Sequence, residues 1–474
     1  MKSKIFLDKI EEDLNVGYGL YVRKLVVKDY IIHVAFISQI TDKNDISGKI
    51  ISPLLQYDKD DITIEIIAHS IIYTDNILID EDENKILSYI YEGNSIIIVE
   101  GENSYIATNV IKKEKRNIET PQFENSIRAP LDAFNEDLNT NLNLIRSRMK
   151  DTGFKVEKFI VGTRTKTNIA LAYVIDIAND NYVNEIRNRI EGISIDGIFE
   201  SGYIEKIISN KKNGLFPEMG ITEKADTVGA NLLEGKVCIL IDGSNLALLA
   251  PKTFIEFFDS GEDHYSNTYF STFVYVTRLL SFIITLTLSP MYVSIVSFHP
   301  DVLPSQYILA LASTRAGVPV NAITEAFIME IVVEILREAS IRLPKKIGPA
   351  IGIVGTIVIG QAAVIAGLVS PLMVIIVSLG SITSFVAPDY TVINPVRILK
   401  FFMIIITGMF GLYGVAMGLT IILINLISTY SITIPYMAPV SPSNFKEILT
   451  SIYTSLSDKG TRPKFMKTKD KKRR

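Results

Sequence analysis

Three carboxylates recur every four residues in a segment that is otherwise mostly apolar. Glu330, Glu334 and Glu338 therefore fall on one face of a helix predicted over residues 321–340, with Arg337 beside them. Carboxylates inside a membrane domain mark ion or proton paths. An amphipathic helix can also lie at the headgroup surface with the same face in water. We predict a cation path along this face, with the lipid surface as the alternative.

Two further polar side chains are candidates for the same path. Glu325 falls on the opposite, apolar face of the segment. It can meet the helix dipole near the N-terminus or face a water-filled path. Gln361 lies in a long uncharged run, where it can line a pore or form a hydrogen bond between helices.

Other kinds of chemistry are not indicated. The segment Gly162–Thr167 resembles a phosphate loop, but Thr165 stands where a glycine must precede the lysine, and a strand is predicted after it. The histidines have no partners at metal-ligand spacing, and no nucleophile motif is present. We therefore predict no catalytic residue, no metal, no cofactor and no nucleic-acid partner.

Charge divides the 474 residues into three regions. Residues 1–278 hold 43 acidic and 31 basic side chains, residues 279–430 hold 6 and 7, and residues 431–474 hold 3 and 10. The drop in charge in the middle, with a mean hydropathy of +0.27, is too large for one soluble globule. We predict a soluble head, an all-α polytopic membrane domain over residues 279–430, and a basic tail.

The membrane domain is predicted from uncharged runs of about twenty residues, which match the thickness of a bilayer. The last run is longer than a span needs, so a tilt or kink is expected. Spans are predicted at residues 279–298, 347–368, 371–387 and 398–427.

Residues 321–340 are predicted to be amphipathic or re-entrant, because five charges cost more in lipid than the apolar residues return. Four spans then place the head and the tail together in the cytoplasm. This leaves Arg342, Lys345 and Lys346 on the outer side, which a five-span model corrects at the cost of moving the more basic tail outside. We prefer four spans.

The head is predicted to be α/β or α+β, with subdomains at residues 1–111 and 121–270. Apolar runs, amphipathic periodicity and an Asp-Gly turn underlie this prediction. A lone cysteine, Cys238, and an opening without an apolar signal segment favour a reducing, cytoplasmic compartment. The expected elements are strands at 25–27, 31–37, 62–67 and 96–99, a helix at 134–149, strands at 159–161 and 169–177, a helix at 182–191 and a hairpin at 236–249.

Small residues mark predicted helix contacts, within a subunit or between subunits. The second span carries Gly348 and Gly352, and the last carries a stripe that includes Gly411, Gly414 and Gly418.

Several long segments resemble one family. They are SIRAPLDAFNEDLNTNLNLIRSRMK (126–150), VGTRTKTNIALAYVIDIA (161–178), FPEMGITEKADTVGANLLEGKVCILIDGS (216–244), VSFHPDVLPSQ (296–306) and IVGTIVIGQAAVIAGLVSPLMVIIVSLGSITSFVAPDY (353–390). Together they resemble the A subunits of GerA-type spore germination receptors, over about residues 126–434.

The resemblance implies a subunit of a nutrient-responsive receptor in the spore inner membrane. It implies a homo-oligomer that forms a nutrient-gated ion channel, with a transporter-like B subunit and a lipoprotein C subunit as partners. Many members carry an acidic residue within the stretch that corresponds to residues 362–367. Here that stretch is AAVIAG, which puts an ion preference based on it in doubt. The alternative function is a secondary transporter or permease of a small solute, although four spans offer no visible repeat.

Overall fold

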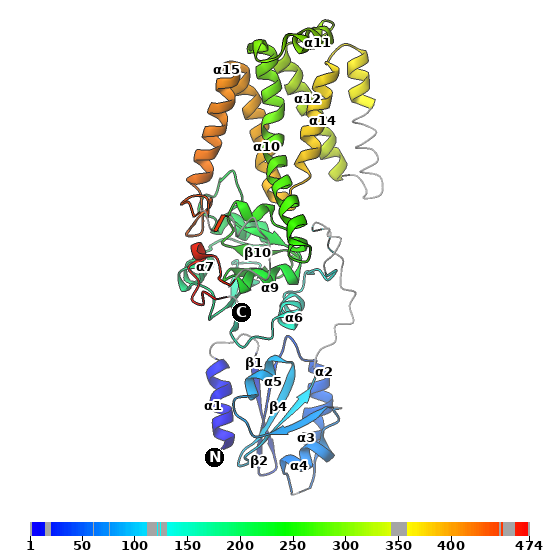
Figure 1. Cartoon of the computed structure of the whole chain (residues 1–474). Helices are drawn as coiled ribbons and strands as arrows, with labels where there is room; N and C mark the ends of the chain where they lie inside the picture. Colours follow the sequence, from blue (N-terminus) through cyan, green and yellow to red (C-terminus); the bar gives the residue numbers. More distant parts are fainter. Residues whose placement is uncertain are drawn as a thin grey trace. The chain divides into compact units, whose positions relative to one another are not determined.

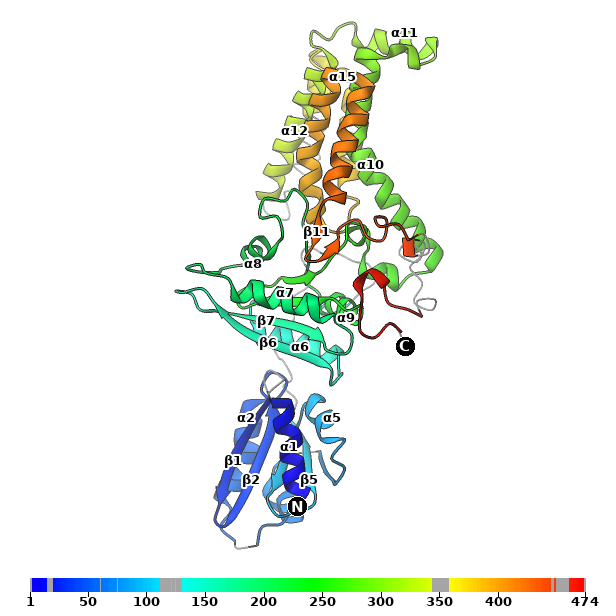
Figure 2. The same cartoon turned by 90° about the vertical axis from the view of Figure 1, so that its left-hand side faces the viewer.

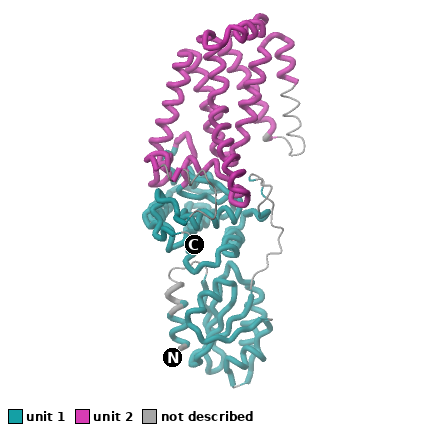
Figure 3. The backbone as a smooth tube through the Cα atoms, viewed as in Figure 1, with its two compact units in different colours: residues 1–212, 219–251, 459–474 teal, residues 213–218, 252–458 magenta. Residues whose placement is uncertain are grey.

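The computed structural model describes residues 2–14, 20–59, 61–74, 76–110, 130–342, 358–444 and 460–472, with positions 121, 124, 447 and 448. The chain forms two compact units (Figure 3). Unit 1 comprises residues 1–212, 219–251 and 459–474, and unit 2 comprises residues 213–218 and 252–458.

The first part of unit 1 is a five-stranded sheet in the order β1-β2-β4-β5-β3 with antiparallel neighbours (Figure 1). Side chains of β4 alternate between two cores, Ile97 and Val99 on one face and Ile96 and Ile98 on the other. Both faces are therefore covered by helices. The elements are α1 (Lys2–Leu14), β1 (Leu20–Val27), β2 (Tyr30–Ile37), α2 (Lys43–Asp45), α3 (Ser52–Gln56), α4 (Ile64–Ile66), β3 (Ile77–Asp80), α5 (Ile86–Tyr91), β4 (Asn94–Val99) and β5 (Tyr105–Asn109), with π-helical turns at Ile46–Ile51 and Ile67–Ile71.

The strand predicted at residues 62–67 is wrong, because residues 64–71 are helical. Thr63 caps α4 by accepting a hydrogen bond from the Ile66 backbone N–H at 3.3 Å. Ile64, Ile67 and Ile71 then bury the same helical face. A short isoleucine-rich run cannot be assigned to strand or helix from composition alone.

The second part of unit 1 is another five-stranded sheet, in the order β6-β7-β9-β10-β8, again with antiparallel neighbours. Antiparallel pairing makes both subdomains α+β, one of the two predicted classes. The elements are α6 (Leu138–Arg148), β6 (Phe154–Val161), β7 (Thr167–Val174), α7 (Asp180–Glu191), α8 (Ser201–Ile208), β8 (Gly220–Thr222), α9 (Ala225–Leu233), β9 (Val237–Ile241) and β10 (Ala247–Ala250).

Several predictions for this subdomain are confirmed. The β6–β7 and β9–β10 pairs form at the predicted turns, and α7 ends at Gly192. The helix predicted from residue 134 begins later, at Leu138, because Asp137 caps it; Phe134 precedes the helix but is buried in the same core.

The basic C-terminal segment is bound to unit 1. Arg462 Nε donates to the Leu233 carbonyl at 2.7 Å, and Lys469 Nζ lies 2.6 Å from the Asp180 carboxylate. Met466, in a 3₁₀ turn (Lys464–Met466), is buried. Residues 460–472 are therefore part of a folded domain and not a free polar tail.

Unit 2 contains long apolar helices that run side by side (Figures 1 and 2). They are α10 (Thr268–Phe298), α12 (Ala322–Arg342), α14 (Pro371–Ser384) and α15 (Ile393–Ile427), with shorter elements α11 (Ser305–Arg315), a helix at residues 358–365, 3₁₀ turns at Ile255–Phe258, Gly261–His264, Pro300–Val302 and Tyr390–Val392, and a small ladder of β11 (Tyr430–Ser431) with β12 (Ile434–Pro435). Two helical segments in the described residues, 268–298 and 390–427, are long and apolar enough to cross a membrane.

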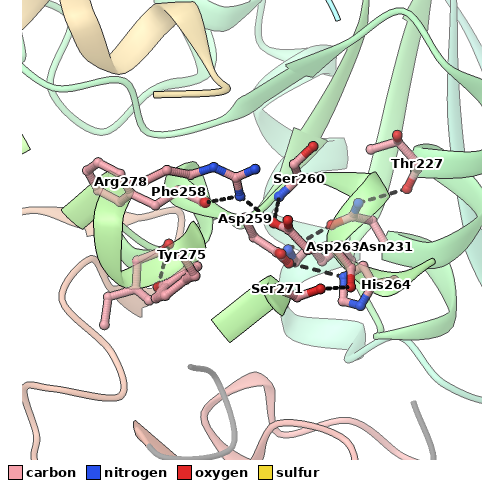
Figure 4. A network of polar contacts seen from close by, with 12 residues as sticks. Thr227, Asn231, Phe258, Asp259, Ser260, Asp263, His264, Ser271, Tyr275 and Arg278 are labelled. Carbon is pink, nitrogen blue, oxygen red and sulfur yellow. Dashed lines mark hydrogen bonds and ion pairs between the residues drawn. The ribbon is translucent and has the colours of Figure 1, made fainter. Parts of the chain in front are cut away.

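The base of α10 is fixed by polar contacts (Figure 4). Arg278 is buried inside α10, which begins ten residues earlier and so extends beyond the predicted first span. Its guanidinium pairs with Asp263 and donates to the Phe258 carbonyl at 3.1 Å. The Tyr275 hydroxyl donates to the Ile255 carbonyl at 3.1 Å. These contacts neutralise the charge that the sequence places at this helix.

α15 is a helical hairpin and not one long span. Gly411 has φ +60° and ψ −139°, which breaks the helix. A Cβ on Gly414 would lie 2.4 Å from the Ile406 carbonyl oxygen, and one on Gly418 would lie 2.4 Å from Met403 Sδ. In a continuous helix these pairs would be separated by about 12 and about 22 Å along the axis. The predicted kink is therefore a complete reversal, and the predicted stripe of glycines lies where its two halves approach.

Residues 358–365 and α14 form a helical hairpin, as far as the structure describes it. A Cβ on Gly360 would lie 3.2 Å from Val374 Cγ1, which requires the chain to fold back. The remainder of the predicted second span, with Gly348 and Gly352, lies outside the described residues.

Candidate functional site

The predicted row of carboxylates on α12 faces other helices. Glu330 is 4% exposed and forms an ion pair of 2.7 Å with Lys400 of α15. It also accepts a hydrogen bond of 2.9 Å from Ser289 of α10. This side chain is therefore held inside the helical unit by two neighbouring helices.

The other two members of the row are also paired. Glu334 forms an ion pair with Arg397 of α15. Glu338 pairs with Arg342 one turn later on α12 at 2.7 Å, and both side chains are exposed. Each carboxylate of the row therefore has its own basic partner, and none of the three partners is Arg337.

Glu325 is fully buried. Its carboxylate pairs with Arg315 of α11 at 2.8 Å and accepts a hydrogen bond of 2.6 Å from the Ser370 backbone N–H. Ser370 is the N-cap of α14, so Glu325 satisfies a free amide and meets the positive end of that helix. The Tyr292 and Ser370 hydroxyl oxygens lie 3.3 Å apart. Glu325 therefore lies in the first turn of α12 and also at the N-terminus of α14.

Pairing lowers the free-energy cost that the sequence prediction assigned to burying α12 in lipid. The cost was summed as a separate transfer free energy from water to lipid for each charged residue. Opposite charges in direct contact with additional hydrogen bonds recover much of this cost. The partners come from α11 and α15, so the local sequence of α12 could not reveal them.

Arg337 is bound differently. Its guanidinium donates to Ser384 Oγ at 2.9 Å and, more weakly, to Ser381 Oγ at 3.4 Å. It also lies 4.9 Å from the centroid of the Phe385 ring. Nothing in the local sequence of α12 indicates these serine partners, which lie on α14.

These side chains surround a small, partly open pocket of about 10 Å³, which has room for about one water-sized ion or molecule. The lining combines two carboxylates, three basic side chains and uncharged residues: Thr285, Glu330, Val333, Glu334, Arg337, Ser384, Val396, Arg397, Lys400 and Phe401. All come from α10, α12, α14 and α15.

Gln361 lies apart from this group. It is exposed on the helix at residues 358–365, and it forms no hydrogen bond with the α12 charges among the described residues. The structure therefore does not bring the two groups of predicted path residues together.

The segments considered for other chemistry have ordinary structural roles. Gly162 and Lys166 both have positive φ in the turn between β6 and β7. The element that follows the lysine is a strand and not a helix. Cys238 is buried in β9, where desolvation raises the pKa of its thiol. Within the described ranges, no group of three or more His, Cys, Asp or Glu side chains is placed to hold a metal ion.

Comparison with known proteins extends the resemblance beyond the predicted residues 126–434. The model of the Bacillus/Clostridium GerA spore germination protein family matches residues 8–465. Spore germination protein KA of Bacillus subtilis is 37% identical over 91% of this chain and 80% of that protein. The uncharacterized membrane protein YfkQ of the same organism is 35% identical over 88% of this chain and 81% of that protein.

A solved structure is also similar. It is the N-terminal domain of the A subunit of the Bacillus megaterium spore germinant receptor GerK3, 26% identical, covering 53% of this chain and 93% of that chain with a TM-score of 0.38. With the family model matching nearly the whole sequence, the chain belongs to the GerA family of spore germination proteins.

Proposed function

We propose that this chain is the A subunit of a nutrient-responsive germination receptor in the spore inner membrane. Its helical unit spans the membrane several times, and copies of the chain assemble around an ion path that opens when a nutrient is bound. A transporter-like B subunit and a lipoprotein C subunit complete the receptor. Membership of the GerA family supports the role in germination.

The observation that carries the membrane assignment is the arrangement of charge in unit 2. The Glu330–Lys400 and Glu325–Arg315 pairs are buried, while large apolar side chains such as Ile365, Ile382 and Ile424 are more than half exposed. A water-soluble bundle has the opposite arrangement. Paired charges inside and apolar residues outside are typical of a bundle solvated by lipid.

Gln361 is the best candidate to face the ion path. An exposed amide on an apolar helix is costly against lipid tails, so it favours either a neighbouring subunit or water. The α12 carboxylates are weaker candidates for conduction, because their charges are neutralised inside one subunit.

Germination of spores tests the function. Spores that lack this chain but retain its B and C subunits should fail to lose refractility with any of the twenty amino acids, and the wild-type chain should restore the response to at least one. A variant with Gly411→Leu, which cannot adopt the hairpin, should accumulate poorly and not restore it. Equal responses with and without the chain would contradict the proposal.

A further inference from the structure

One buried cation of unit 2 has no carboxylate partner among the residues that the structure describes. Arg337 is 8% exposed, and its hydrogen-bond acceptors are the neutral hydroxyls of Ser381 and Ser384. Its Nε is buried with no acceptor in the described part of the chain. The Phe385 ring supplies only a weak interaction with the cation.

The carboxylates that share the pocket with Arg337 are already engaged. Glu330 is held by Lys400 and Ser289, and Glu334 is held by Arg397. Three basic side chains therefore face two carboxylates, which leaves one positive charge in excess. A guanidinium does not lose its proton in proteins, so it cannot avoid this cost by becoming neutral.

We propose that the pocket between α10, α12, α14 and α15 binds one small monovalent anion at the Arg337 guanidinium. Arg397 and Lys400 add to the positive potential, and the Nε–H supplies a donor for which the described residues offer no acceptor. The anion is a free halide-sized ion or the phosphate of a lipid headgroup. The site does not depend on whether the chain conducts ions.

Two substitutions at Val333 give a sharp test that keeps Arg337 in place. Val333 lines the pocket one helical turn before Arg337. Val333→Glu supplies a carboxylate that takes the place of the anion, whereas Val333→Gln has nearly the same size and no charge. Arg337→Gln removes the cation directly, and Arg342→Gln removes an exposed one outside the pocket.

Equilibrium dialysis of the delipidated full chain in detergent, with radioactive chloride and gluconate as the replacement anion, measures the binding. Wild type, Val333→Gln and Arg342→Gln should bind about one chloride per chain, and Val333→Glu and Arg337→Gln at least tenfold more weakly. Equal binding by Val333→Glu and Val333→Gln would overturn the proposal. Absence of specific binding by wild type, both in detergent and in the phosphatidylglycerol nanodiscs described next, would also overturn it.

The same measurement in phosphatidylglycerol nanodiscs separates the two sources of the anion. Unchanged chloride affinity in the nanodiscs identifies a free ion. Chloride binding in detergent that weakens tenfold or more in the nanodiscs identifies the lipid phosphate as the occupant.

Discussion

The residues of α12 illustrate how the partner of a charge, and not its presence, decides its role. The spacing of Glu330, Glu334 and Glu338 correctly predicts that they share a face. The sequence contains Arg397 and Lys400 as well, but more than sixty residues later, and nothing local indicates that they reach α12. A face predicted to attract cations is therefore occupied by ion pairs.

Breaking the Glu330–Lys400 pair should destabilise unit 2. Glu330→Gln leaves a buried ammonium without a counter-charge, which costs about 3 kcal/mol of unfolding free energy. The double variant Glu330→Gln, Lys400→Met removes both charges and should recover most of this loss. Unfolding in mixed detergent, with Glu338→Gln as an exposed control expected to cost under about 0.5 kcal/mol, measures the effect. A single variant no less stable than the control would show that the pair contributes nothing.

Helices and strands are predicted best from the sequence where nearby turn residues or glycines mark their ends. The β6–β7 and β9–β10 hairpins and the end of α7 are correctly predicted from turn residues and a terminal glycine. The helical segment at 64–71 is not, because β-branched residues favour strands and tertiary packing overrides that preference. The reversal in α15 is missed because a single glycine in an apolar run leaves hydropathy unchanged.

The hairpin in α15 predicts a specific cross-link. Cysteines at Met403 and Gly418 should be joined by a reagent of about 8 Å, because the two positions lie side by side. In a straight helix they would be about 22 Å apart. Cys238 is buried and does not compete. A shift in peptide mass after digestion measures the product, and a pair at Met403 and Phe410, seven residues apart on one half, calibrates the reagent. If only the calibration pair reacts, α15 is a continuous helix.

The C-terminal segment should contribute to the stability of unit 1. Met466→Ala removes a buried side chain and should cost about 2 kcal/mol, which corresponds to about 30-fold faster hydrogen exchange where the segment contacts α7. Lys464→Ala, at an exposed position in the same turn, should leave the exchange unchanged. Equal exchange in both variants would mean that the segment is not bound.

For the whole molecule, sequence resemblance supplies the biological context and the structure supplies the constraints on it. Composition separates an acidic head at residues 1–278 from an apolar region at residues 279–430, whereas the compact unit that contains the long apolar helices comprises residues 213–218 and 252–458. Neither composition nor periodicity indicates a response to nutrients or a role in spores. Both parts of the proposal rest on membership of the GerA family. The number of crossings depends on packing of α12 and on the reversal in α15, and these are tertiary features.

An even number of crossings, as predicted from the sequence, places both ends of the chain in the cytoplasm. Single cysteines at Lys212 and Lys471 should resist an impermeant thiol reagent added to intact cells, whereas one at Thr314, beyond the far end of α10, should react. All three positions are exposed, and buried Cys238 gives little background. Labelling of Lys471→Cys without Lys212→Cys would require an odd number of crossings.

The most direct measurement of the central claim is the reversal potential of the assembled chain in a planar bilayer. Under a tenfold salt gradient, the wild-type receptor should pass nutrient-dependent current. Gln361→Glu should shift the reversal potential toward cation selectivity and Gln361→Lys in the opposite direction, because each places a charge beside the path. The control Thr420→Glu, at an exposed position on α15, should leave the reversal potential unchanged. Absence of current from the intact receptor, or identical reversal potentials for both Gln361 variants, would contradict an ion path lined by this helix.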